Sequence, residues 1–104
     1  MEIQEFGKLQ DSTQASLLTI ENKNGMRLSM TDFGAAIVSL QVPDRDGQLV
    51  DVVLGYDNVA DYETDTNAFG ATIGRVGNRI AGAKFVIDGR SYALDANDGK
   101  QCLH

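Results

Sequence analysis

The stretch that decides the fold class is Lys84-Phe85-Val86-Ile87-Asp88-Gly89-Arg90-Ser91-Tyr92-Ala93-Leu94. It contains two runs of aromatic and β-branched residues on either side of Asp88-Gly89, and an Asp-Gly pair between two such runs is a strong signal for a β-hairpin. Because a tight hairpin turn joins antiparallel strands, this stretch predicts antiparallel β structure.

The residues upstream of the hairpin repeat its pattern of short β runs separated by turns. Residues 26–31 alternate strictly, with Met26, Leu28 and Met30 on one face, and this period of two indicates a half-buried strand. The run that follows contains Ile37, which we expect in the core. Further β runs are expected at residues 16–21, 35–42 and 50–55, and turns at residues 22–25 and 43–47.

One helical turn is expected at residues 57–62, with Asp57 as its candidate cap and Val59 and Tyr62 on one side. Apart from this turn, the sequence predicts an all-β, mostly antiparallel structure. A length of 104 residues is enough for one small domain and too short for two. Residues 1–104 are therefore expected to belong to a single domain.

The composition argues against several classes of function. The formal net charge of −6 disfavours binding to nucleic-acid phosphates or to anionic membrane surfaces. No apolar run approaches the roughly 20 residues needed to span a bilayer, and the charged residues 1–8 lack the apolar core of a signal peptide. A single cysteine, Cys102, excludes an internal disulfide. We therefore expect a soluble, cytoplasmic protein with no nucleic-acid or membrane partner.

A polar small-molecule site is the functional hypothesis for Gly70-Ala71-Thr72-Ile73-Gly74-Arg75-Val76-Gly77-Asn78-Arg79-Ile80. Glycine permits close approach of the backbone to a ligand, and arginine supplies a rigid fork of donors that suits oxygen-rich partners. The alternative is a glycine-rich bulge whose arginines point into water. From the residue types alone, this alternative is slightly favoured.

Familiar cofactor and metal motifs are not matched. The three glycines of this stretch have neither the dinucleotide-binding nor the phosphate-loop spacing. The acidic residues 61–67 resemble a calcium loop, but Thr66 and Thr72 stand where such a loop needs its glycine and its last carboxylate. A solvated acidic loop is the better prediction, and no metal or cofactor is expected.

His104 is the only histidine and lies two residues after Cys102. On a strand the two side chains would share a face, and together they could form a thiol–imidazole nucleophile. The favoured alternative is that Cys102 is a small buried cysteine without a catalytic role. A lone histidine is usually an ordinary surface residue, yet imidazole is also the side chain best suited to proton transfer near neutral pH. One cysteine and one histidine cannot build a structural zinc site.

Seven segments together resemble one protein family. They are Gly34-Ala35-Ala36-Ile37-Val38-Ser39-Leu40, Val42-Pro43-Asp44, Asp51-Val52-Val53-Leu54-Gly55-Tyr56-Asp57, Gly70-Ala71-Thr72-Ile73-Gly74-Arg75, Asn78-Arg79-Ile80, Phe85-Val86-Ile87-Asp88-Gly89 and Leu103-His104. In this order they are similar to the N-terminal part of the aldose 1-epimerases, or galactose mutarotases. The resemblance covers nearly the whole chain. Gln101 is a small departure, because the family more usually has asparagine there.

This resemblance implies an antiparallel β-sandwich, the supersandwich of galactose mutarotase. It also implies an enzyme that interconverts the α and β anomers of a free aldohexose without a cofactor. By position, Asn78, Arg79 and His104 would contact the sugar, and Arg75 would support the local structure. The family's general acid, a second histidine, and its general base, a C-terminal glutamate, have no counterpart in residues 1–104. The chain is therefore interpreted as an N-terminal fragment that is inactive alone and prone to self-association, because its strand edges and apolar face lack partners.

Three alternatives remain open at this stage. An epimerase for phosphorylated hexoses would require additional basic residues in the cleft. A non-catalytic carbohydrate-binding module would hold sugar through Asn78, Arg79 and His104 without turnover. A structural β domain would have no ligand. The preferred sugar and the oligomeric state do not follow from the sequence.

Overall fold

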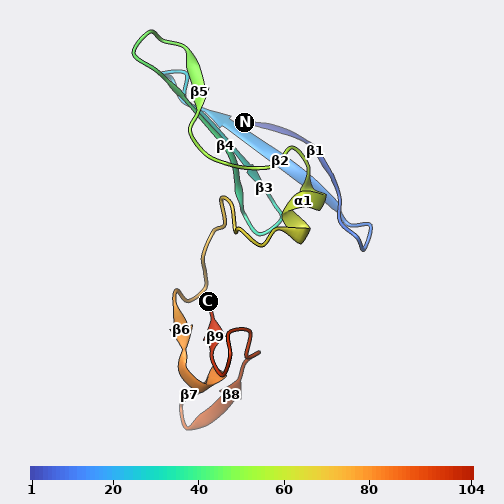
Figure 1. The fold of residues 1–104 in the computed structure, drawn as a ribbon, viewed down its shortest axis with the longest axis vertical. Coiled ribbons are helices and arrows are strands. Elements are labelled where there is room, and N and C mark those ends of the chain that lie inside the picture. Colours follow the sequence, from blue (N-terminus) through green and yellow to red (C-terminus); the bar gives the residue numbers. More distant parts are fainter. The chain divides into compact units, whose positions relative to one another are not determined.

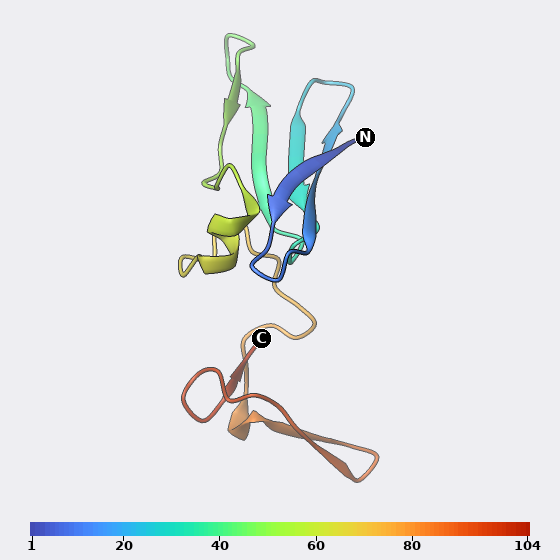
Figure 2. The same cartoon turned by 90° about the vertical axis from the view of Figure 1, so that its right-hand side faces the viewer.

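The computed structural model describes all of residues 1–104, in two compact units, Met1–Thr72 and Ile73–His104. Figures 1 and 2 show their elements. In the first unit these are β1 (Glu2–Lys8), β2 (Gln14–Glu21), β3 (Arg27–Thr31), β4 (Ile37–Pro43), β5 (Leu49–Asp51) and α1 (Val59–Thr64). In the second they are β6 (Arg79–Ile80), the 3-10 turn η1 (Ala81–Ala83), β7 (Lys84–Ile87), β8 (Arg90–Ala93) and β9 (Cys102–Leu103).

The first unit is built on one antiparallel sheet in which strands that follow one another in sequence also lie side by side, in the order β1-β2-β3-β4-β5. The predicted turns close two of its hairpins: the Gly25 N–H donates to the Asn22 carbonyl at 3.0 Å, and the Gly47 N–H donates to the Asp44 carbonyl at 3.1 Å. The antiparallel prediction is therefore confirmed for this unit.

Strand β5 is shorter than predicted because Asp51 ends it. One oxygen of its side chain accepts the backbone N–H groups of Leu40 and Val53, each at 3.1 Å. A side chain that takes up backbone donors in this way competes with the strand ladder. The predicted run at residues 50–55 is consequently a strand only as far as Asp51.

The core of the first unit lies between one face of the sheet and α1. Its buried members are Phe6, Ala15, Leu17, Ala36, Val59 and Tyr62. Tyr62 packs its ring 6.0 Å from that of Phe6 and 5.1 Å from that of Tyr56. The prediction that Val59 and Tyr62 share the inner side of a helical turn is confirmed, since both are buried.

The helix cap is Asn58, so the prediction of Asp57 was wrong by one residue. Asn58 has an extended backbone, with φ −151° and ψ 159°, and its Oδ1 accepts the Asp61 N–H at 3.1 Å. An asparagine in this conformation satisfies one of the free N–H groups of the first turn. Asp57 lies one position too early for its side chain to serve as the cap.

Ile37 is only half-buried, contrary to the expectation that it belongs to the core. Its backbone N–H donates to the Gly70 carbonyl at 2.8 Å, so the chain after α1 returns against β4 at this point. Gly70 has φ +62°, and a Cβ built on it would lie 1.9 Å from the Ile37 carbonyl oxygen. Close passage of one backbone over another explains why glycine is needed here.

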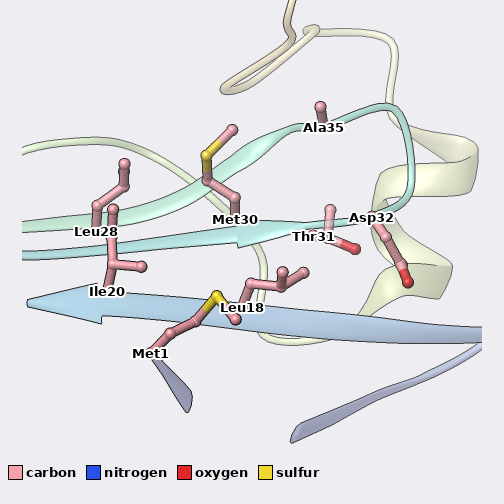
Figure 3. Close-up of a pocket in the computed structure, with 8 residues that line it drawn as sticks. All are labelled: Met1, Leu18, Ile20, Leu28, Met30, Thr31, Asp32 and Ala35. Carbon is pink, nitrogen blue, oxygen red and sulfur yellow. The ribbon is translucent and has the colours of Figure 1, made fainter. Parts of the chain in front are cut away.

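The opposite face of the same sheet is apolar and not covered by any other element of its unit. Figure 3 shows Leu18 and Ile20 of β2 beside Leu28 and Met30 of β3, with Met1 next to them. They line a groove of about 330 Å³. Ile20 keeps 49% and Met1 87% of its surface exposed. The predicted alternation of Leu28 and Met30 is therefore confirmed, but the face on which they lie is the uncovered one.

The second unit contains the hairpin that the Asp-Gly pair predicts. Strands β7 and β8 are antiparallel, with Ile87 opposite Arg90. Asp88 has φ 50° and Gly89 has φ 76°, and positive φ at both central residues is the mark of a type I′ turn. Across the strands the rings of Phe85 and Tyr92 are stacked at 5.3 Å.

Candidate functional site

The two-stranded ladder of β6 and β9 brings together three residues that the sequence singles out. Arg79 lies opposite Leu103 in this antiparallel pair. Just beyond it, the His104 N–H donates to the Asn78 carbonyl at 2.7 Å. Asn78 and Arg79 thus neighbour His104 through backbone pairing, although they are distant in sequence.

Asn78 occupies the left-handed backbone region, with φ 60°. Asparagine enters this region more readily than residues with bulky or branched side chains do. The chain bends at Asn78, immediately before β6. The Asn78 Oδ1 accepts a hydrogen bond from Arg79 Nη1 at 3.2 Å.

Arg79 is held from a second direction by Asp98. Its Nε donates to Asp98 Oδ2 at 2.6 Å, and the two side chains are 47% and 38% exposed. The remaining N–H groups of the guanidinium make no hydrogen bond in the structure. Arg79 is therefore oriented by its neighbours and still has donors available for an oxygen-rich ligand.

The loop between β8 and β9 supplies Asp98 and is itself pinned to β9. The side-chain amide of Asn97 accepts from the Leu103 N–H at 2.6 Å and donates to the Leu103 carbonyl at 3.1 Å. Asp98 and Gln101 exchange two backbone hydrogen bonds, at 3.1 and 3.0 Å. The sequence predicts this segment only as a loop. The Asn-Asp-Gly run gives a turn signal, but nothing local indicates which distant residue Asp98 would meet.

A cleft of about 550 Å³ in the second unit is lined by His104, whereas Asn78 and Arg79 do not line it. Arg75 and Cys102 also border it. The apolar part of the lining consists of Val76, Ile80, Phe85 and Leu94. Cys102 and His104 both border this cleft, although β9 ends at Leu103 and His104, with φ 63°, lies outside the strand on which a shared face was predicted. The structure gives Cys102 a weak contact with the Leu103 carbonyl at 4.0 Å and no hydrogen bond to His104.

Arg75 has no partner in the structure. It makes no ion pair, since the three pairs present involve Arg27, Arg45 and Arg79. Arg75 does border a cleft in its own unit.

The acidic loop after α1 is held together by hydrogen bonds that converge on Asp65. Its carboxylate accepts from the Asn67 N–H at 2.7 Å, the Tyr56 hydroxyl at 2.8 Å and the Phe69 N–H at 3.0 Å. Burial alone would raise the pKa of Asp65, but these hydrogen bonds outweigh it and lower that pKa. The carboxylate of Asp65 is therefore engaged within the loop, while Asp61 and Asn67 are exposed, as expected of a solvated acidic segment. No group of three or more His, Cys, Asp or Glu side chains is arranged to hold a metal ion, and no helix is long and apolar enough to cross a membrane.

Comparison with known sequences identifies the family. The sequence profile of aldose 1-epimerase matches residues 16–104. The chain is 43% identical over 79 residues to galactose mutarotase of Bos taurus, covering 76% of this chain and 23% of that protein. It is 42% identical over 94 residues to aldose 1-epimerase of Haemophilus influenzae, covering 90% of this chain and 27% of that protein. The chain thus spans about a quarter of the length of these relatives.

Solved structures agree with the sequence comparison. An aldose epimerase homologue from C. elegans superimposes with a TM-score of 0.75 at 37% identity, over 86% of this chain and 28% of that one. Galactose 1-epimerase from Lactobacillus acidophilus superimposes with a TM-score of 0.72 over 99% of this chain and 29% of that one. At 23% identity the second likeness concerns the fold alone. The chain therefore belongs to the aldose 1-epimerase family and has the antiparallel β fold of galactose mutarotase-like proteins.

Proposed function

We propose that this protein belongs to an aldose 1-epimerase that interconverts the α and β anomers of a free hexose such as galactose or glucose. The observation that carries this proposal is the pairing of β6 with β9, which gathers Asn78, Arg79 and His104 at one place. Opening the sugar ring removes the proton of the C1 hydroxyl and protonates the ring oxygen, and closure on the other face reverses both transfers. Donors held beside the sugar oxygens stabilise the charge that develops on them.

The roles of the three residues follow from their contacts. Arg79 has free guanidinium N–H groups that can donate to sugar oxygens, while its Nε and one Nη1 hydrogen are already engaged. The backbone of His104 is anchored through its N–H, which leaves its imidazole to border the cleft. Asn78 fixes the position of both neighbours and presents an amide. We propose that all three contact the sugar, with no metal or cofactor involved.

Residues 1–104 are proposed to be inactive without further acid–base groups. His104 is the only histidine of the chain. All four glutamates belong to the unit Met1–Thr72, where Glu21 pairs with Arg27 at 3.0 Å and Glu63 accepts the Gln10 N–H at 2.9 Å. The unit Ile73–His104 thus has donors for a sugar but no glutamate to act as the general base. We propose that the principal acid and base are contributed from outside these residues, and that residues 1–104 are the N-terminal part of one β-sandwich domain.

Binding of sugar without turnover is the second candidate function. It is favoured by a different observation, namely that the unit Ile73–His104 contains oriented donors but no glutamate and only one histidine. The proposed partner is an aldohexose, and the proposed location is the cytoplasm. Self-association of the 104-residue chain is also proposed, because the groove between β2 and β3 leaves apolar side chains exposed.

Polarimetry of freshly dissolved α-D-galactose tests the proposal. The 104-residue chain and the product of the whole reading frame that contains it would be measured side by side, each with an Arg79→Ala variant. Arg90→Ala is the matched control, because Arg90 lies in the same unit and stacks over Tyr92 at 5.3 Å, away from the β6–β9 ladder. Mutarotation above buffer only in the longer product, lost with Arg79→Ala and kept with Arg90→Ala, is the expected result.

The outcomes separate the two candidate functions. Galactose binding by both proteins, observed by ligand-detected NMR without faster mutarotation, would support the binding function. Unchanged galactose binding and unchanged mutarotation in Arg79→Ala would contradict both. Mutarotation by the 104-residue chain alone, abolished by Arg79→Ala, would contradict the proposed inactivity of these residues.

A further inference from the structure

We propose that Asp98 is a positioning residue for Arg79, which sets the direction in which the guanidinium presents its donors to a sugar. This inference rests on the proposed function, since it concerns the same site. It is carried by one contact that links two segments of the second unit. Arg79 Nε donates to Asp98 Oδ2 at 2.6 Å, from β6 to the loop before β9.

Two contacts engage Nε and Nη1 of the guanidinium and leave Nη2 free. Arginine carries five N–H groups in a planar fork. The Nε hydrogen is used by Asp98, and one Nη1 hydrogen is used by Asn78 Oδ1 at 3.2 Å. Because the group is planar, these two bonds determine its orientation. Both hydrogens of Nη2 and the second hydrogen of Nη1 remain to donate to the hydroxyl oxygens of a ligand.

Asp98 is itself held, which is necessary if it is to position another side chain. Its N–H and carbonyl are both hydrogen-bonded to Gln101, at 3.1 and 3.0 Å. The preceding residue, Asn97, is bonded to both backbone groups of Leu103. Leu103 in turn lies opposite Arg79 in the β6–β9 ladder. Asp98 and Arg79 are therefore fixed to the same pair of strands.

The Arg79–Asp98 ion pair should affect the affinity for a ligand more than the stability of the folded state. Both side chains are more than a third exposed, and exposed ion pairs contribute little to stability. A donor group that is already oriented, however, loses less side-chain freedom when the ligand binds. Removal of the Asp98 charge should therefore weaken sugar binding while leaving the folded state nearly as stable.

The first measurement is the mobility of the Arg79 side chain, in the 104-residue chain without any sugar. In a 15N relaxation experiment, the Nε–H of Arg79 should be more ordered than that of Arg45, whose side chain is 92% exposed. Asp98→Asn should bring Arg79 close to the mobility of Arg45. Asp95→Asn is the matched control, because Asp95 lies in the same loop, is exposed and makes no hydrogen bond in the structure. An Arg79 Nε–H that is equally ordered in both variants would overturn the proposal.

The second measurement is galactose affinity in the longer gene product, with a double-mutant cycle. Coupling between contacting residues predicts that Asp98→Asn weakens binding about 3- to 10-fold, whereas Asp95→Asn has no effect. In an Arg79→Ala background, Asp98→Asn should cause no further loss, because Asp98 acts through Arg79. An equal loss in both backgrounds would contradict the positioning role. Thermal unfolding of each variant separates these effects from destabilisation.

The two measurements keep this inference distinct from the proposed function. If Arg79→Ala leaves galactose affinity unchanged, the proposed function fails, and so does the part of this inference that concerns sugar. If Arg79→Ala abolishes binding while Asp98→Asn behaves like Asp95→Asn in both experiments, the proposed function stands and this inference is overturned.

Discussion

Arg79 and Asp98 form an ion pair at 2.6 Å across 19 residues of sequence. The pair exists because the β7–β8 hairpin lies between them and the chain then returns along β6. The loop that carries Asp98 is closed by hydrogen bonds to the strand that pairs with Arg79. The Arg79 guanidinium thus contacts Asp98 of this loop and the neighbouring Asn78, and these contacts are the structural basis of the proposed sugar site.

Substitutions at Asn78 should separate its backbone role from its side-chain role. Asn78 has φ 60°, a conformation that costs an ordinary L-residue about 1–2 kcal/mol. Asn78→Val should therefore lower the free energy of unfolding by about 1–2 kcal/mol, because a β-branched residue is poorly suited to this region. Asn78→Gly should be nearly neutral for folding, yet it should weaken galactose binding through loss of the amide. Urea unfolding and a binding titration of both variants check this. Equal destabilisation by valine and glycine would show that the conformation is not the cause.

Gly70→Ala should be among the most destabilising single substitutions in the chain. Its Cβ would lie 1.9 Å from the Ile37 carbonyl oxygen, and its φ of +62° adds strain. We expect a loss of more than about 2 kcal/mol, because the backbone of one segment would have to move. Gly25→Ala is the control, since Gly25 has φ +83° and no atom within 4 Å of its added Cβ; it should cost about 1 kcal/mol. Comparable unfolding midpoints for the two variants would contradict the close approach described here.

Asp51 should make the stability of the chain depend on pH in the acidic range. A hydrogen bond from the Ser39 side chain, opposed by burial and assisted by backbone N–H groups, lowers the pKa of Asp51. Because the folded-state pKa lies below the unfolded-state value, the stabilisation is present above the unfolded-state pKa and is lost as pH falls through the folded-state one. Asp51→Asn should therefore reduce the loss of stability as the pH falls below the ordinary aspartate pKa of 3.8. Asp95→Asn provides the control, and identical pH profiles for both variants would refute the role of Asp51.

A charged side chain in the groove between β2 and β3 should suppress self-association. Ile20 lines this groove and is 49% exposed, so Ile20→Lys places a charge on the apolar face with little disturbance of the core. Leu54→Lys is the control, because Leu54 is 71% exposed and lies outside the groove. Sedimentation velocity over a range of concentrations should show fewer oligomers for Ile20→Lys only. A wild-type chain that is monomeric at every concentration would remove the basis of this prediction.

The β7–β8 hairpin of the second unit was predicted from local signals in the sequence, whereas the edge strand of the first unit was not. Asp88 and Gly89 are the central residues of this turn and both have positive φ, so the Asp-Gly pair and the β runs on either side of it, residues 84–94, were sufficient to predict the hairpin. The edge strand β1 was not predicted. Its pairing with β2 shifts register between Glu5 and Gly7, and such a bulge interrupts the period of two by which a strand is recognised.

The candidate site was only partly predictable for a similar reason. Asn78, Arg79 and His104 could be named through the resemblance of their motifs to the family. Asp98 and Asn97 could not, since an acid and an amide in a loop have many possible partners. Their partners became identifiable only when the β6–β9 register placed Leu103 opposite Arg79.

The sequence by itself determined the family, through motifs spread over residues 34–104. It also determined the antiparallel class and the positions of the tight turns, because turns depend on residue types within a few positions of one another. Tertiary structure alone decided which face of the first sheet is covered by α1. Leu17 and Leu18 are adjacent and equally apolar, yet Leu17 is in the core and Leu18 lines the open groove. Alternation along a strand distinguishes two faces but does not say which of them another element will cover. That choice depends on contacts between residues far apart in sequence.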